Sequence, residues 1–363
     1  MWRILRPDAV SAPKDKGVMD ALGRYLKVMS DNLPAKFMIC RRVPVKTELS
    51  SEEGELWQAH KDGLRSCRGL INKINNGKVE LKKLKVPEVS LLDLKVELAR
   101  RILKSCHFCE RECGVDRTEG ETGFCRVGAK PRVSSEFIHY GEEPELVPSF
   151  TIFFSGCTFK CQFCQNWDIS QNPSDGTLVS SGALSSSIST KRRKGTRNIN
   201  WVGGDPTPNL HVILEALNEC KLNVPSVWNS NMYLSKDGMN LLFGTQDVYL
   251  TDMKYGNDEC ALKYSKAPNY WEVISRNHKL AFSDAELIIR HLVLPGHVEC
   301  CTKPVLEWIA NNLGPSVRIN LMEQYRPAGR AHDYPELSRR PTSDEMNRAF
   351  QIAKETELKN LAK

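Results

Sequence analysis

The sequence predicts an α/β fold in which β-strands alternate with helices around a parallel sheet. From residue 149 onward, short β-rich runs recur, and helical stretches fill the gaps between several of them. Strands and helices that alternate in this way build βαβ units, whose strands run parallel. With 363 residues, of which 40% are hydrophobic and 26% charged, the chain is large enough to bury a substantial core.

Six strands are expected in this region. Helices fit at 208–222 and 303–313, where leucine, isoleucine and valine recur at helical spacing. In barrels of parallel strands the chemistry lies at the carboxyl ends of the strands, and each polar motif described below follows a strand. The six strands are expected at 150–154, 198–202, 227–229, 248–252, 287–294 and 317–321.

The flanking regions are predicted to be helical. A helix start is expected at 50–53, and an amphipathic helix at 91–103 is expected to pack on the main domain, with binding of a partner as the alternative. The basic run 191–194 is expected to be a solvated linker or a helix end. Thr342 opens a capping box for a C-terminal helix. The predicted regions are a helical extension (1–104), a cysteine-rich segment (105–148), a barrel (149–330) and a helical tail (331–363).

Three cysteines follow the first predicted strand. Cys157, Cys161 and Cys164 have the spacing C-x3-C-x2-C, and Gly156 marks the exit from the strand. Iron–sulfur clusters usually take four thiolates, so a loop with three indicates a [4Fe–4S] cluster with one iron open to a ligand from outside the protein. A structural zinc site is the alternative, but such sites use four ligands, usually as two separated pairs.

This spacing, with Phe163 just before the last cysteine, resembles the signature of the radical S-adenosylmethionine (SAM) superfamily. The resemblance implies a partial (βα)6 TIM-like barrel that holds a [4Fe–4S] cluster and SAM. It also implies that SAM is cleaved reductively to methionine and a 5′-deoxyadenosyl radical, which abstracts hydrogen from a substrate. Cys157, Cys161 and Cys164 would then be the catalytic cluster ligands, with Phe163 beside the cofactor.

Motifs after the next strands resemble SAM-binding segments of the same superfamily. The Gly-Gly-Asp-Pro turn at 203–206 resembles the GGEP motif, whose backbone binds the SAM amino group; a plain turn is the alternative. The later motifs resemble those of pyruvate formate-lyase activating enzymes, with Lys254 facing substrate or, alternatively, pairing with Asp252. The cofactor contacts implied by the resemblance are Gly203, Gly204, Asp205, Pro206, Asn229, Ser230, Asp252 and Arg290.

Four further cysteines precede the first predicted strand. They have the spacing C-x2-C-x3-C-x11-C, and three glycines lie among them. Four thiolates so close in sequence predict a closed four-ligand site, which suits either Zn²⁺ or a second iron–sulfur cluster. A structural role and an electron relay both stay open. The four are Cys106, Cys109, Cys113 and Cys125, whereas Cys220, Cys260, Cys300 and Cys301 lack the spacing of a metal site.

These upstream cysteines, together with a G-E-x-x-x-L-V-P segment at 141–148, resemble the PflX-type branch of pyruvate formate-lyase activating enzyme-like proteins. The resemblance implies an oxidoreductase that activates a protein substrate, as in glycyl-radical enzymes, with an electron donor such as flavodoxin or ferredoxin. The alternatives are a radical SAM enzyme that modifies a small molecule or another protein residue, and a non-catalytic iron–sulfur or zinc scaffold.

Composition limits the remaining possibilities. The net charge of +7 is mild and gives no argument for a nucleic-acid partner. No stretch approaches the roughly 18 apolar residues of a membrane span, and the N-terminus lacks the apolar segment of a secretory signal, so a cytoplasmic protein is expected. In that compartment, 13 cysteines indicate metal ligands rather than disulfides.

Overall fold

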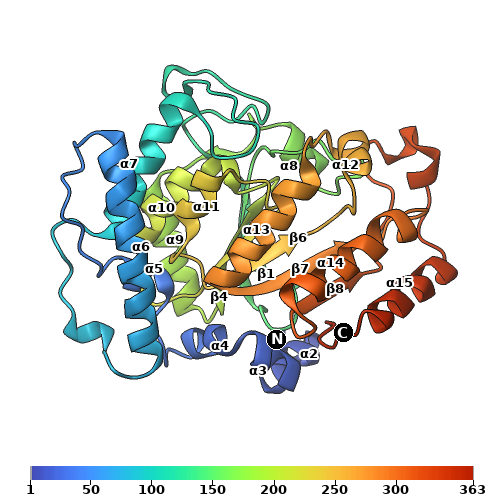
Figure 1. Ribbon diagram of the computed structural model, residues 1–363, viewed down its shortest axis with the longest axis horizontal. Helices are drawn as coiled ribbons and strands as arrows, with labels where there is room; N and C mark the ends of the chain where they lie inside the picture. Colours follow the sequence, from blue (N-terminus) through green and yellow to red (C-terminus); the bar gives the residue numbers. More distant parts are fainter. Residues whose placement is uncertain (1, 363) are drawn as a thin grey trace.

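The computed structural model describes residues 2–362, which form one open sheet with the strand order β3-β1-β2-β4-β5-β6-β7-β8 (Figure 1). Strands β2 and β4 to β8 run parallel. They coincide with the six predicted strands and confirm the α/β prediction. Their bounds are β2 (Ser149–Phe154), β4 (Asn198–Gly203), β5 (Ser226–Ser230), β6 (Val248–Asp252), β7 (Glu286–Leu292) and β8 (Arg318–Met322).

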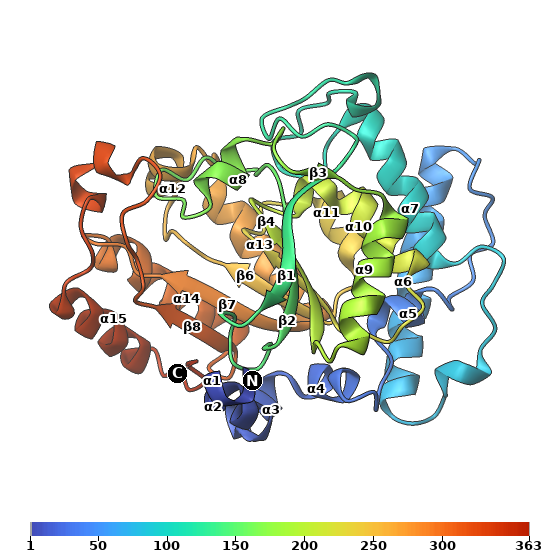
Figure 2. The same cartoon turned by 180° about the vertical axis from the view of Figure 1, so that it is seen from behind.

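Two antiparallel strands extend the sheet beyond the prediction. Strand β1 (Arg132–His139) pairs with β2, and the short β3 (Thr177–Leu178) pairs with β1. Figure 2 shows β1 passing in front of the parallel strands. Its sequence, RVSSEFIH, buries only Val133. The strand was not predicted because it lies at the edge region of the sheet and carries no run of apolar residues.

Helices cover the outer side of the parallel strands. Helix α9 (Ser181–Arg193) begins after Ser180, whose side chain accepts a hydrogen bond from the Ala183 amide, and Leu184 and Ile188 are its buried apolar residues. The basic run predicted as a linker or helix end forms the last turn of α9. The other helices of this layer are α8 (Trp167–Gln171), α10 (Leu210–Glu219), α11 (Lys236–Leu242), α12 (Asp258–Ser265), α13 (Tyr270–Asp284) and α14 (Lys303–Leu313).

The N-terminal extension packs on one side of this layer. Helix α7 (Leu91–Ile102) begins with a capping box between Ser90 and Asp93 and lies against α10 and α6 (Glu53–Asn75), as predicted. The expected serine cap of α6 does not form, because Glu52 occupies the N-cap position and makes no side-chain cap bond. Helix α5 (Lys36–Cys40) also contacts α6.

The amino ends of the strands are closed by the beginning of the chain. Val18, Leu22 and Tyr25 form a small apolar cluster with residues of β5, β6 and β7. The opposite, carboxyl ends of the strands therefore hold the space for a site. The helices at the closed end, near which both termini lie (Figures 1 and 2), are α1 (Trp2–Leu5), α2 (Pro7–Ser11), α3 (Lys16–Ala21) and α4 (Gly23–Met29).

The C-terminal tail returns to the same end. Helix α15 (Ser343–Glu355) begins with the predicted capping box between Thr342 and Glu345. After it, Asn360 donates a hydrogen bond from Nδ2 to the Gly17 carbonyl at 2.9 Å, which joins the two ends of the chain. Among residues 2–362, every helix is too short or too polar to cross a membrane.

Candidate active site

A cavity of about 220 Å³ lies at the carboxyl ends of the parallel strands. None of its described lining residues comes from 2–104. The cavity brings together all of the predicted catalytic and cofactor-contact residues except Pro206, which is buried in the adjoining turn. Its polar and cysteine lining consists of Cys157, Cys161, Cys164, Gln165, Asn166, Asp205, Asn229, Ser230, Asn231, Asp252, Lys254 and Arg290, with Phe163, Gly203 and Gly204 beside them.

The three cysteines of the loop after β2 are largely buried, and each sulfur has a hydrogen-bonding partner from another segment. Hydrogen bonds to sulfur are one of the means by which a protein tunes an iron–sulfur cluster. The contacts are Asn231 Nδ2 to Cys157 Sγ (3.7 Å), Ser265 Oγ to Cys161 Sγ (2.9 Å), and Ser170 Oγ with Cys164 Sγ (3.4 Å).

Burial raises the pKa of two of these thiols, those of Cys157 and Cys161. It raises the pKa of Cys157 well above its ordinary value and that of Cys161 to about 12, although the Lys254 ammonium works in the opposite direction at Cys161. A metal must therefore displace the protons when it binds. The buried thiolates that form in this way suit a bound cation, which balances their negative charge.

The Gly-Gly-Asp-Pro turn is held directly against the three-cysteine loop. Gly203 has φ +136°, and a Cβ there would collide with the Phe154 carbonyl, while a Cβ on Gly204 would collide with that of Gly156. The Gly204 amide donates to the Phe154 carbonyl at 2.9 Å, and the Asp205 amide donates to that of Gly156 at 3.0 Å. Glycine is required here because the two backbones approach so closely.

The Asp205 carboxylate joins the ends of β4 and β5. Its Oδ2 accepts hydrogen bonds from Ser230 Oγ and the Asn231 amide, both at 3.0 Å, and its Oδ1 accepts from the Thr207 amide at 2.9 Å. Burial raises the pKa of this carboxyl despite those donors. Asp205 thus positions Asn231, which in turn donates to Cys157.

Arg290 is paired with two glutamates to which the sequence analysis assigned no role. Its Nε donates to Glu143 Oε1 at 2.7 Å, Nη2 pairs with Glu142, and Nη1 donates to Asn229 Oδ1 at 3.3 Å. Burial opposes ionisation of Glu143, but Arg290 outweighs it and holds the pKa of Glu143 below its ordinary value. Asn229 is left with an unpartnered Nδ2, a buried donor at the cavity wall.

Asp252 and Lys254 form an ion pair at the same wall, with Lys254 Nζ 2.6 Å from Asp252 Oδ2. The structure therefore contains the pairing that the sequence analysis left as an alternative, and both residues also line the cavity. Burial opposes the charge on Lys254, yet the Asp252 carboxylate raises its pKa overall. His291, in β7, is buried between the Met253 carbonyl and Thr302 Oγ1.

The four upstream cysteines lie outside this cavity, in a lobe of loops at 105–131 that packs over the three-cysteine loop. Buried Arg117 donates to the Pro208 carbonyl at 2.8 Å and to that of Gly128 at 2.5 Å. Arg111 donates from Nη2 to the Thr158 carbonyl at 3.1 Å. Within residues 2–362, no three of the lobe's cysteine sulfurs lie within 4.8 Å of one another.

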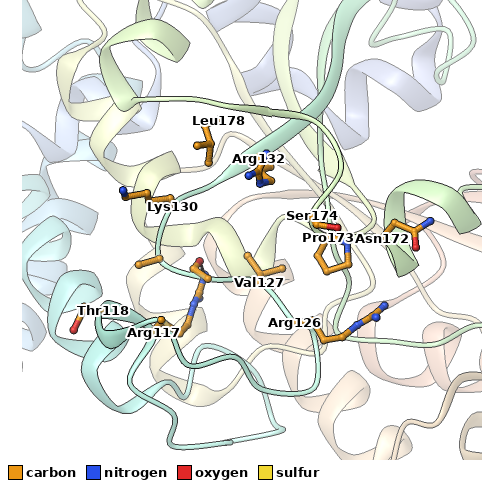
Figure 3. Close-up of a pocket in the computed structure, with 13 residues that line it drawn as sticks. Arg117, Thr118, Arg126, Val127, Lys130, Arg132, Asn172, Pro173, Ser174 and Leu178 are labelled. Atoms are coloured by element: carbon orange, nitrogen blue, oxygen red, sulfur yellow. Dashed lines mark hydrogen bonds between the residues drawn. The ribbon is translucent and has the colours of Figure 1, made fainter.

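A second, larger cavity of about 580 Å³ lies between this lobe and the segment 172–178 (Figure 3). Its charged lining residues, among those described, are all basic: Arg117, Arg126, Lys130 and Arg132. Val127 and Pro173, also in its wall, lie against Gly156, the residue before Cys157. The sequence analysis missed this cavity, although the spacing of Arg126, Lys130 and Arg132 was a signal that could have indicated it.

Comparisons with known proteins agree with this arrangement. Residues 151–309 match the family model described as the Radical SAM superfamily. Residues 151–309 therefore form a domain of the radical SAM superfamily, whose members are enzymes that use a [4Fe–4S] cluster and SAM.

The chain also belongs to the same family as a protein of Methanocaldococcus jannaschii, Uncharacterized protein MJ0674. The two are 46% identical over 342 residues, which cover 93% of this chain and 98% of that one. A second protein of that organism, Uncharacterized protein MJ0808, is 25% identical over 182 residues, 45% of this chain and 52% of that one.

Solved structures with a similar fold include Streptococcus suis SuiB bound to S-adenosylmethionine, with 11% identity and a TM-score of 0.43. That match covers 57% of this chain and 47% of SuiB, so the chain spans less than half of that protein. Escherichia coli QueE has 15% identity and a TM-score of 0.36, over 64% of this chain and 92% of QueE.

The residues of the first cavity fit the cofactors of this superfamily. The donor set contains three buried thiols, the ligand type that iron–sulfur clusters use. An unpartnered amide donor, Asn229 Nδ2, lies at the wall of the same cavity and is suited to a carboxylate. The mixed charges of Lys254, Asp252 and Arg290 suit a zwitterionic ligand such as SAM.

Proposed function

We propose that this protein is a radical SAM enzyme that binds a [4Fe–4S] cluster through Cys157, Cys161 and Cys164 and SAM in the adjoining cavity. The bound cofactors would supply a 5′-deoxyadenosyl radical that abstracts hydrogen from a substrate. The observation that carries this proposal is the convergence of three hydrogen-bonded thiols, the Gly-Gly-Asp turn and an unpartnered Asn229 amide on one cavity.

The chain's own residues would bind and orient the cofactor. Asn229 offers Nδ2 to the SAM carboxylate, and the Gly-Gly backbone approaches closely enough to contact the amino group. Arg290 would act mainly by fixing Asn229, because Glu142 and Glu143 already neutralise its charge. Phe163, in edge contact with Tyr255 and Tyr325, would help to exclude water from the cavity.

The substrate we propose is a protein, as in glycyl-radical activation of the pyruvate formate-lyase type. The support is that residues 2–104 do not line the cavity, so its mouth is left to the loops after the strands. A cap from this extension would have favoured a small molecule. The second hypothesis is that the substrate is a small molecule or another residue of a protein. The third is that the protein is a non-catalytic scaffold.

The electron donor, we propose, is an acidic reductant of the flavodoxin or ferredoxin class in the cytoplasm. The basic cavity shown in Figure 3 is suited to acidic side chains of such a partner. Its wall residues Val127 and Pro173 lie against Gly156, next to Cys157. An electron delivered there would have a short path to the proposed cluster.

For the upstream lobe we propose a second iron–sulfur cluster rather than zinc. A single zinc ion needs its thiolates close together, at roughly 3.8 Å for tetrahedral bonds of about 2.3 Å. No three sulfurs of the lobe approach within 4.8 Å in residues 2–362. A cluster of several irons holds its thiolates farther apart, which suits this spacing.

The test is anaerobic. The protein is reconstituted with iron and sulfide, iron is counted, and 5′-deoxyadenosine is measured after dithionite and SAM are added. We expect product and about eight irons per chain, and loss of product with about four irons in the Cys157→Ala/Cys161→Ala/Cys164→Ala variant.

The matched control is Cys113→Ala, which removes a thiol of the lobe. We expect it to retain product while losing iron, since dithionite does not need a relay. Product in the triple variant would contradict the proposed cluster site. A fully loaded wild type without product, even when candidate protein substrates are supplied, would favour the scaffold.

A further inference from the structure

A third group of thiols lies away from both cysteine regions. It joins Cys260, in the first turn of α12, with His297, in the turn after β7, and Cys300, in a single π-helical turn (Val298–Thr302). One ligand atom from each of these three residues lies within 4.8 Å of the other two. Neither the radical SAM cavity nor the upstream lobe includes them.

A fourth donor is adjacent. Cys301 Sγ lies 3.9 Å from Cys300 Sγ, and Asn257 Nδ2 donates to Cys301 Sγ at 3.8 Å. Tetrahedral zinc with Zn–S bonds of about 2.3 Å holds its sulfurs roughly 3.8 Å apart. The spacing of the two sulfurs therefore suits neighbouring ligands of one zinc ion, and the set of three cysteines and one histidine is a common one for structural zinc.

The surroundings of His297 also suit a ligand. Its Nδ1 lies 2.7 Å from the Pro295 carbonyl, so Nδ1 carries the proton and Nε2 presents a lone pair. The neighbour of Nε2 is the Tyr264 hydroxyl at 3.1 Å, but that hydroxyl is 2.5 Å from Glu336 Oε1. The carboxylate is the stronger acceptor for the single Tyr264 proton, which leaves Nε2 without a donor.

We propose that Cys260, His297 and Cys300 bind one Zn²⁺, with Cys301 as the fourth ligand. The metal would join α12 to the turn after β7, two elements that no strand pairing connects directly. Ser265, the last residue of α12, donates to Cys161 Sγ at 2.9 Å. The zinc therefore holds in place a helix that carries a hydrogen-bond donor to the cluster loop. Its role is to stabilise the fold and to position Ser265.

The sequence spacing of Cys260, Cys300 and Cys301 is not that of a metal site, and only the fold brings these residues together. In sequence, Cys260 stands alone and is followed only much later by His297, Cys300 and Cys301. The fold brings the two parts together, because α12 and the π-helical turn follow the neighbouring strands β6 and β7 at the same end of the sheet.

The experiment is a zinc count on the full chain, purified without added metal, by mass spectrometry of the elements. Cys300 is exposed and Cys260 half-buried, so serine at both positions is expected to leave the fold intact. We expect the Cys260→Ser/Cys300→Ser variant to lose one zinc per chain. Cys220→Ser, which removes a buried thiol that donates to the Leu222 carbonyl far from this site, is expected to lose none.

A second readout separates this site from the upstream lobe. Zinc K-edge absorption of a Cys113→Ser variant, in which the lobe is disrupted, should show sulfur and nitrogen neighbours with roughly three sulfurs. A wild-type zinc content that the double serine variant leaves unchanged would overturn the proposal. A disulfide between any two of Cys260, Cys300 and Cys301, detected by peptide mapping under non-reducing conditions, would also overturn it.

Discussion

The two predicted cysteine sites differ in how the fold supports them. The loop of Cys157, Cys161 and Cys164 lies at the end of a parallel sheet, and partners from α8, α12 and the β5 loop each contact one sulfur. The lobe of Cys106 to Cys125 is made of loops on the outside, where Cys113 is exposed. Buried Arg117 ties it to the Pro208 carbonyl, and the Glu110 amide donates to the Tyr233 carbonyl after β5.

The difference indicates different degrees of preorganisation. Residues at strand ends are held by the sheet hydrogen bonds and by the core beneath them, so their side chains return to one arrangement. A lobe of loops depends on the metal itself for much of its order, since metal binding and folding are coupled in such segments. We therefore expect the first site to be formed before its proposed cofactor binds, and the second to be completed only when its proposed metal binds.

The largest effect should separate the two sites by activity. Cys161→Ala is expected to lower 5′-deoxyadenosine formation with dithionite by about 100-fold or more, because the cluster loses one of three ligands. Cys113→Ala should change it by less than about threefold. Comparable losses in both variants would show that the lobe is part of the catalytic centre. The measurement is product per chain at equal iron loading of the loop site.

The next effect concerns the support behind the cavity. Arg290→Gln leaves Glu142 and Glu143 buried without their cation, and should lower the free energy of unfolding by about 3–5 kcal/mol at pH 7. Urea unfolding of the metal-free protein measures it. Conservation of wild-type stability would show that the two glutamates ionise without the arginine.

The pH dependence of that pair follows from the lowered pKa of Glu143. A depressed folded-state pKa stabilises the protein above the ordinary value of 4.5, and this stabilisation is lost as the pH falls through the folded-state pKa. The loss in free energy of unfolding caused by Arg290→Gln should become smaller as the pH falls toward 4.5. The carboxyls of Glu142 and Glu143, which lack their cation in this variant, then take up protons. A loss in free energy of unfolding that stays the same at every pH would contradict the ion pair between Arg290 and the two glutamates.

A smaller effect should appear in the lobe. Arg117→Gln removes hydrogen bonds to the Pro208 and Gly128 carbonyls, and should cost about 2–3 kcal/mol, since bonds from charged donors contribute about 1.5–3 kcal/mol each and glutamine replaces part of them. Hydrogen exchange should quicken at 105–131 and stay unchanged in β2. An equal increase in the hydrogen-exchange rates of residues 105–131 and of β2 would show that the lobe and the barrel unfold together.

The smallest effect tests a single bond to sulfur. Ser265→Ala removes the donor to Cys161 Sγ. A hydrogen bond contributes about 1 kcal/mol, which corresponds to roughly 40 mV for one electron, and its loss should make the cluster potential more negative. Redox titration followed by electron paramagnetic resonance measures the shift. An unchanged potential would show that this hydroxyl does not contact the cluster ligand in the loaded protein.

The sequence by itself determined the fold class, the six parallel strands and the group of residues at their carboxyl ends. It could do so because strands buried in a parallel sheet are short apolar runs, and because the loop cysteines and the Gly-Gly-Asp-Pro turn are local patterns. Strand β1 escaped prediction because its pairing with β2, rather than its own polar sequence, makes it a strand.

Only the tertiary structure decided which partners those residues have. Arg290 is separated from Glu142 and Glu143 by about two fifths of the chain, and Cys260 from His297 and Cys300 by a helix and a strand. Such pairings depend on which strand ends become neighbours in the sheet. Local sequence carries no record of that neighbourhood, since long-range contacts are set by the packing of the whole core.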